Sequence, residues 1–265
     1  MKTLVVATDM SPAANNAALY AAKAAQITRH HLVLFHLYKV PHHVSNSLIG
    51  TKGIDEMVEF TRRKLEHYAK ELADMYQVTI DVDVRMGEMM EVIPQVMEQY
   101  DAEMLVMGMP KLTFEQALLG NTTRAAMQRF QFPIFIIPEG AGFQGIKRIL
   151  YACDLSKGVD KRILHQVKHY ARLFNAELQV IYVGDPERSI KEEQTLKREM
   201  EDLPYTYKNV QSESVTRALQ EEALNIHADV IIMTPHKSGF WASVLGQSKT
   251  KAMLSQGTIP LLSIA

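Results

Sequence analysis

The strongest constraint on the fold is an internal repeat that runs through the whole chain. Four blocks of the first half return in the same order in the second half. A duplicated sequence folds into a duplicated structural unit, so the repeat predicts two copies of one fold. A glycine, Gly120 or Gly246, also follows the third block of each copy at the same distance. The matched blocks are Lys2–Ser11 with Lys147–Ser156, His31–Leu37 with Glu177–Val183, Ala102–Met107 with Ala228–Met233, and Phe132–Ile137 with Ile259–Ile264.

The segment between the two copies has the composition of a linker. Residues Pro138–Gly145 are rich in glycine and begin with proline, and both residue types interrupt helices and strands. A length of 265 residues is compatible with one large domain or two small ones, and the repeat decides for two. We therefore expect one domain at residues 1–140 and a second at residues 146–265.

Within each copy, short apolar runs alternate with helical patterns. The runs Leu4–Thr8 and Leu32–Leu37 are almost entirely apolar, as in strands that are covered on both faces. Between them a helix is expected at Ala13–Thr28, with Ser11 as its N-cap and Pro12 in its first turn. Such alternation predicts an α/β fold with an open, doubly wound parallel sheet in each copy. The remaining elements of the first copy are expected at Asp55–Asp74 (helix), Val78–Val84 (strand), Met89–Tyr100 (helix), Met104–Met107 (strand), Thr122–Arg129 (helix) and Ile134–Ile137 (strand).

Charge and composition exclude several classes of function. The chain has 29 Lys and Arg against 30 Asp and Glu, so no overall positive field attracts nucleic acid or an anionic membrane. Its single cysteine, Cys153, cannot form an internal disulfide, and the apolar run after Lys2 is too short for a signal peptide. No apolar stretch approaches the roughly 18–20 residues that span a bilayer. We expect a cytoplasmic protein with neither nucleic-acid nor membrane partners.

One ordered set of residues links each copy to a known family. In the first copy the set is Thr8-Asp9 followed by Ser11, then His36-Leu37, Gly87, Val106-Met107-Gly108, Leu118-Leu119-Gly120 and Pro133-Ile134. In this order the residues resemble a domain of the universal stress protein family, and the resemblance covers essentially the whole chain, once per copy. It implies a Rossmann-like, five-stranded parallel sheet of the adenine nucleotide alpha hydrolase-like class in each domain, and a role in the stress response. It also implies that the two domains pack as an intramolecular pseudo-dimer, with a homodimer of the whole chain as a further option.

Some members of this family bind ATP through a loop after the fourth strand. The loop reads Gly, two residues, Gly, nine residues, Gly and then Ser or Thr, and its glycines let backbone amides approach phosphate oxygens. The first copy keeps the first glycine as Gly108 but has Lys111 at the second glycine position. The interval to Gly120 is one residue short, and Asn121 replaces the hydroxyl residue.

The second copy departs further from the ATP loop. Thr234 and Lys237 replace the two early glycines, the interval to Gly246 is equally short, and Gln247 follows. A lysine adds bulk and disfavours positive φ, which argues that the backbone cradle is lost. Alternatively, the lysine side chains at Lys111 and Lys237 supply charge to a phosphate, as lysines do in other phosphate loops.

An aspartate ends the first strand of each copy. Asp9 and Asp154 match the acidic residue that lies near the nucleotide in ATP-binding relatives, by the resemblance. An aspartate at this position can instead cap the helix that follows, with Ser11 or Ser156 sharing that role. Both roles suit the same geometry, so the sequence leaves them open.

The other side chains indicate no catalysis and no metal site. Leu37 and Val183 stand where relatives use backbone groups to hold adenine, and their side chains are ordinary strand ends. His165 and His169 lie four residues apart on one helix face, which we interpret as a surface or boundary pair because no third ligand accompanies them. Cys153 has no positive neighbour in the sequence that would stabilise a thiolate, so we expect an inert thiol.

These observations favour a non-catalytic binding or interaction module of the stress response whose ATP loops are degenerate. Under this hypothesis the chain has no cofactor, no catalytic residue and no metal site. The alternative hypothesis is a sensor that binds ATP or another adenine nucleotide in the first copy, with weak ATP hydrolysis as an option. The residues of the nucleotide sites would then be Asp9, Leu37, Gly108, Lys111, Gly120 and Asn121 in the first copy, and Asp154, Val183, Lys237 and Gly246 in the second.

Overall fold

The fold is known from a computed structural model of the chain. The structure describes residues 2–38, 51–110, 126–127, 129–155, 158–188, 190–234 and 259–265. We call residues up to 138 the first half and residues from 148 onward the second half. None of the helices in these described segments is both long and apolar enough to cross a bilayer.

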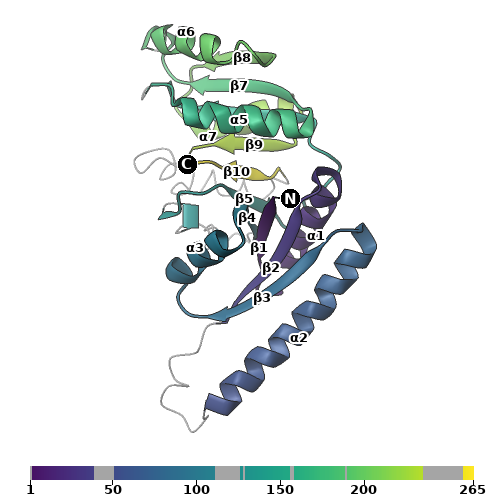
Figure 1. The fold of residues 1–265 in the computed structure, drawn as a ribbon. Coiled ribbons are helices and arrows are strands. Elements are labelled where there is room, and N and C mark those ends of the chain that lie inside the picture. The colour runs from purple at the N-terminus through teal and green to yellow at the C-terminus, as the bar shows by residue number, and fades with distance from the viewer. Residues whose placement is uncertain are drawn as a thin grey trace.

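Strands and helices alternate through both halves, as the sequence predicts (Figure 1). The first half contains β1 (Thr3–Ala7), α1 (Pro12–Thr28), β2 (His31–Tyr38), α2 (Thr51–Tyr76), β3 (Ile80–Met86), α3 (Met89–Gln99), β4 (Ala102–Met109) and β5 (Ile134–Pro138). The second half contains β6 (Arg148–Cys153), α5 (Lys161–Phe174), β7 (Glu177–Val183), the 3-10 helix η3 (Pro186–Arg188), α6 (Ile190–Glu199), β8 (Tyr205–Val210), α7 (Val215–Asn225), β9 (Val230–Met233) and β10 (Leu261–Ser263).

The strands form one ten-stranded sheet in the order β3-β2-β1-β4-β5-β10-β9-β6-β7-β8. All strand pairs within a half are parallel, so each half is the five-stranded parallel sheet that was expected. The register also repeats. Ala7 is aligned with Phe35 on β2 and with Met107 on β4. Their counterparts in the sequence repeat are aligned in the same way, namely Ala152 with Ile181 and Met233.

The two halves meet through β5 and β10, which pair antiparallel. Phe135 lies opposite Leu262, and these two residues are counterparts in the sequence repeat. A surface that pairs with its own counterpart has the geometry of an isologous, two-fold contact. Because the pair is antiparallel, the strands of the first half run opposite to those of the second. The carboxyl ends of the strands in the two halves therefore lie at opposite edges of the sheet.

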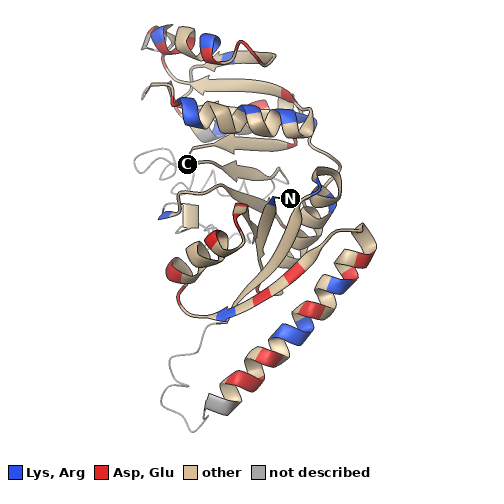
Figure 2. Cartoon of the chain, in the orientation of Figure 1, with Lys and Arg blue, Asp and Glu red and all other residues tan. Residues whose placement is uncertain are grey.

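Helices cover both faces of the sheet. One buried cluster contains apolar residues of α1, α2, α5 and α6, and the other contains residues of α3 and α7. The central strands of the sheet are mainly apolar, whereas charged residues gather on helices such as α2 and α6 and along the edge strand β3 (Figure 2). Helix α1 lies close to the sheet because its buried face is made mainly of alanine, including Ala17, Ala18, Ala21 and Ala22.

The ends of α1 follow the sequence signals. The Ala14 N–H donates to Ser11 Oγ, which is the N-cap, and Pro12 occupies the first turn, as predicted. Arg29 closes the helix in the left-handed region, with φ of 58°. In the second half, Asp160 is the N-cap of α5, and the Arg162 N–H donates to its side chain. Ser156, expected to share the capping role there, lies outside the described residues.

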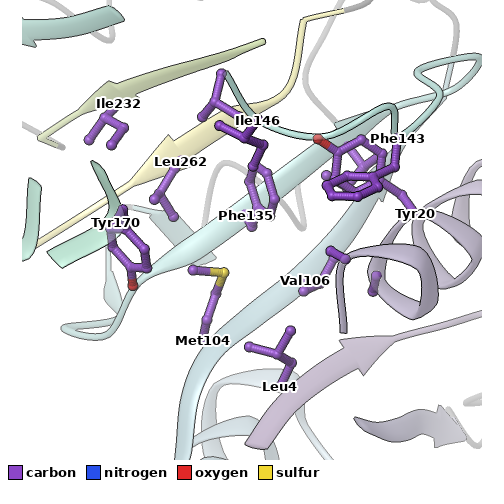
Figure 3. Close-up of a cluster of buried hydrophobic side chains, with 14 of the residues drawn as sticks. Leu4, Tyr20, Met104, Val106, Phe135, Phe143, Ile146, Tyr170, Ile232 and Leu262 are labelled. Atoms are coloured by element: carbon purple, nitrogen blue, oxygen red, sulfur yellow. The ribbon is translucent and has the colours of Figure 1, made fainter. Parts of the chain in front are cut away.

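The segment between the halves packs against the fold. Asn16 Nδ2 donates to the carbonyl oxygens of Pro138 and Ala141, at 3.0 and 3.1 Å. Phe143 and Ile146 are buried, and the Phe143 ring meets the Tyr20 ring edge to face at 5.1 Å (Figure 3). The linker predicted from composition is therefore anchored to helix α1.

Aromatic and aliphatic side chains of both halves fill the space beneath α1 and α5. Tyr20 also meets Phe135 edge to face, with 5.7 Å between the ring centroids (Figure 3). A cavity of about 40 Å³ remains among these side chains, with Leu262 and Tyr170 in its wall. Phe135 thus links the pairing of β5 with β10 to the packing of α1.

Truncation of Phe135 tests this packing. Phe135→Ala should lower the free energy of unfolding by about 3–5 kcal/mol, because it leaves a cavity where the two halves meet. Phe60→Ala is the matched control, since that ring is 57% exposed, and it should cost less than about 1 kcal/mol. Denaturant unfolding followed by circular dichroism measures both, and equal losses would show that Phe135 is not packed between the halves.

Candidate functional site

The predicted site residues of the first half meet at one edge of the sheet. Asp9 follows β1 by two residues, and Leu37 and Gly108 belong to the ends of β2 and β4. The register aligns these three strands, so the residues lie at their carboxyl ends. The strand order reverses between β1 and β4, and open α/β sheets bind ligands at such a switch point.

The polar groups of the turn after β1 make hydrogen bonds with one another. The Ser11 N–H donates to Asp9 Oδ1 at 2.9 Å. The Met10 N–H donates to Thr8 Oγ1 at 3.0 Å, and Met10 has a positive φ of 60°. These bonds shape the entry into α1, which is one of the two roles that the sequence left open for Asp9.

The Asp9 carboxylate is stabilised in its charged form. Burial alone would raise the pKa of Asp9, but the hydrogen bonds from Ser11 outweigh burial and lower it. The charge of His36 lowers the pKa of Asp9 further. Asp9 is nevertheless exposed, so its carboxylate faces solvent at the edge of the sheet.

The end of β2 is tied to the end of β1. His36 Nδ1 lies 2.8 Å from the carbonyl oxygen of Thr8 and donates to it. His36 is thus the satisfied structural histidine that a single imidazole at a strand end suggests. The next residue, Leu37, is partly buried and packs on the cluster beneath α3 with Met89 and Met90. The Leu37 side chain, at the end of β2, therefore has a packing role.

Gly108 is a glycine because helix α1 crosses it. A Cβ added to Gly108 would lie 2.7 Å from the backbone nitrogen of Ala14 and closer still to the carbonyl oxygen of Ala13. Neither neighbour is a flexible side chain that could move aside. The first glycine of the loop pattern therefore has a structural reason in this chain, independent of any phosphate.

The second half brings the counterparts together at the opposite edge. Asp154 follows β6, Val183 ends β7 and Thr234 follows β9. Asp154 and Val183 are both partly buried. The Cys153 thiol donates to the Ile181 carbonyl oxygen at 3.4 Å, and burial raises the pKa of Cys153 to about 12. Burial therefore disfavours the reactive thiolate form of Cys153.

A tyrosine covers the end of β7. The Tyr182 ring lies over Gly184, where an added Cβ would be 2.6 Å from Tyr182 Cζ and closer still to the hydroxyl oxygen. The Gly184 N–H donates to the Val210 carbonyl oxygen at 3.0 Å. The backbone next to Val183 is therefore paired on one side and covered by a ring on the other. Nothing in the sequence motif indicated this arrangement.

Five of the predicted site residues lie outside the described residues. They are Lys111, Gly120, Asn121, Lys237 and Gly246. Within the described segments, no group of three or more His, Cys, Asp or Glu side chains is arranged to hold a metal ion. The described part of the site thus consists of strand ends, and at the first of them Asp9 and His36 make hydrogen bonds within the fold.

Two glycine substitutions separate a packing role from a loop role. Gly108→Ala should lower the free energy of unfolding by about 1–3 kcal/mol, because the new methyl group meets the backbone of α1. Gly142→Ala is the control, since an added Cβ there has no neighbour within 4 Å, and it should be neutral or stabilise by about 0.4–1 kcal/mol. Denaturant unfolding distinguishes them, and a harmless Gly108→Ala would refute the close approach of α1.

Comparison with known proteins gives the same fold. The structure of a universal stress protein from Archaeoglobus fulgidus DSM 4304 aligns with a TM-score of 0.78 at 18% identity, covering 99% of this chain and 97% of that chain. A functionally unknown protein from Pseudomonas aeruginosa PAO1 aligns with a TM-score of 0.63 at 14% identity, covering 100% of this chain and 92% of that one. Both alignments span the two halves.

No curated protein sequence matches the chain at a significant level. The sequence profile of the universal stress protein family, by contrast, matches residues 1–138, which is more than half of the chain. The matched segment includes the strand ends that carry Asp9, Leu37 and Gly108. The chain therefore belongs to the universal stress protein family.

Proposed function

We propose that this universal stress protein is a non-catalytic binding or interaction module of the cytoplasmic stress response, with degenerate nucleotide loops. One observation carries the proposal: the strand-end groups that would face a nucleotide are used by the fold itself. In the first half, Asp9 accepts from the Ser11 N–H, and Gly108 makes room for the first turn of α1. Neither residue needs a ligand to explain its identity.

The second half supports the same proposal more strongly. Tyr182 covers Gly184 at the end of β7, beside the backbone that relatives use for the base. The connection from β6 to α5 spans residues 154–160, whereas the one from β1 to α1 spans residues 8–11. The start of α5 is therefore placed differently relative to the strand ends, and Thr234 stands where the first half has Gly108. We infer that the second half does not bind a nucleotide.

We further propose that residues 1–140 and 146–265 are two domains that pack as an intramolecular pseudo-dimer. The pairing of the counterparts Phe135 and Leu262 at the centre of the sheet supports this arrangement. The same contact surface is used within the chain, so a homodimer of the whole protein would have to form through another surface. The outermost strands of the sheet, among the described residues, are β3 and β8.

The alternative is an adenine-nucleotide sensor that uses the first half alone. One observation favours it: the exposed Asp9 shares the switch-point edge with Leu37 and Gly108. The amino end of α1 lies at the same edge and would favour a phosphate. Lys111, Gly120 and Asn121 would then complete the site, with Lys111 binding the phosphates through its side chain.

Calorimetric titration with Mg-ATP decides between the two functions. The non-catalytic module predicts no binding tighter than about 1 mM. A dissociation constant in the micromolar range would contradict it and support the sensor. In that case Lys111→Ala should weaken binding, whereas Lys237→Ala, at the matching position of the second half, should leave affinity unchanged.

A further inference from the structure

A cluster of charged side chains joins the two halves at Glu103, outside the candidate nucleotide site. Glu103 lies near the start of β4, and its side chain is 12% exposed. Lys2 Nζ is 2.9 Å from Glu103 Oε2, and His30 Nε2 is 3.5 Å from the same oxygen. His169 Nε2 is 3.1 Å from Oε1. His169 belongs to α5, so this ion pair connects the second half to the first.

The Glu103 carboxylate is a fixed negative charge. Burial would raise the pKa of Glu103, but the nearby His30 imidazole, the hydrogen bond and charge of Lys2 and the charge of His169 lower it to about 2. Tyr170 is a further titratable group near the carboxylate. Burial and the charge of Glu103 raise the pKa of Tyr170, so its ring stays neutral.

The contacts around His30 require one more proton than a neutral imidazole ring carries. Thr28 Oγ1 lies 2.9 Å from the Ala24 carbonyl oxygen and 2.7 Å from His30 Nδ1. A hydroxyl group has one proton and cannot donate to both of these acceptors. The other ring nitrogen, Nε2, makes no hydrogen bond to the described residues and faces a carboxylate oxygen. A neutral ring therefore leaves one contact between two acceptors. With the proton on Nδ1 it is the 3.5 Å approach of Nε2 to Glu103, and with the proton on Nε2 it is one of the two contacts of Thr28 Oγ1.

An imidazolium at His30 satisfies every one of these contacts. The Thr28 hydroxyl then donates to Ala24, His30 Nδ1 donates to Thr28, and the proton on His30 Nε2 faces the Glu103 carboxylate. His30 is 7% exposed, so an unmatched contact there is costly. The 40 Å³ cavity reaches Thr28, His30 and Glu103, and the rest of its wall is mainly apolar.

We propose that Glu103, His30 and His169 form a proton-operated latch between the two halves. Proton uptake by His30 places a positively charged ring next to the Glu103 carboxylate. A proton on His169 turns its hydrogen bond with Glu103 into an ion pair across the halves. His169 is 38% exposed and so exchanges protons with solvent. The attraction between Glu103 and the two imidazoles therefore becomes stronger as the solution becomes more acidic, until Glu103 itself is protonated.

The second half has no such latch at the matching position. Asp229 is the counterpart of Glu103 in the repeat, and its Oδ2 accepts from the backbone N–H groups of Lys147 and Arg148, at 2.7 and 2.9 Å. The counterpart of His30 is Ala176. An acidic residue at this strand start can thus be satisfied by backbone alone, and the imidazoles around Glu103 are a separate feature.

Thermal unfolding between about pH 8 and pH 6 tests the latch, because imidazoles titrate in that range. Protons bound by the folded state stabilise it at the lower pH, and this stabilisation is lost as the pH rises. Wild type should therefore gain about 2–4 °C in melting temperature more than Glu103→Gln or His169→Gln over this range. His67→Gln is the control, since His67 is a 77% exposed imidazole paired with Glu71 on α2, and it should behave like wild type.

A double-mutant cycle between Glu103→Gln and His169→Gln isolates the contact that crosses the halves. The coupling should be favourable at about pH 6 and weaker at about pH 8. Should Glu103→Gln fail to fold, ¹⁵N NMR of the wild-type imidazoles gives an independent readout, with both His30 ring nitrogens protonated at about pH 6. An unchanged pH dependence in the variants that fold, or a neutral His30 ring at that pH, would overturn the latch.

Discussion

The structure depends on the antiparallel pairing of β5 with β10. Each half buries its central strands under helices on both faces, but the fifth strand of each would be an open edge if the half stood alone. Pairing the two fifth strands removes both edges and joins two parallel sheets into one. Phe135 and Leu262 face each other at the centre of this contact. Helix α1, the segment between the halves and helix α5 then pack around it.

This pairing also determines where a ligand could bind. Because the halves run in opposite directions, their switch points lie at opposite edges of the sheet, and the two candidate sites cannot share a ligand. Each site must then provide all its own polar groups. At the first edge Asp9 accepts a hydrogen bond within its own turn, and at the second edge Tyr182 lies over Gly184.

Much of the fold followed from the sequence, because a repeat fixes both copies at once. The predicted strand blocks are aligned in matching register, and Ser11 caps α1 as expected. The site was less predictable. A motif identifies Gly108 as a glycine but does not show that Ala13 lies against it. His169 read as a boundary residue, since its partner Glu103 is 66 residues away in sequence and meets it only in the folded chain.

Hydrogen exchange followed by NMR tests most directly whether the two halves form one body. If the pairing of β5 with β10 opens only when the whole protein unfolds, their backbone amides should exchange as slowly as those of β1 and β6. If the amides of β5 and β10 exchange orders of magnitude faster while those of β1 and β6 stay protected, the two halves are independent and this account is contradicted.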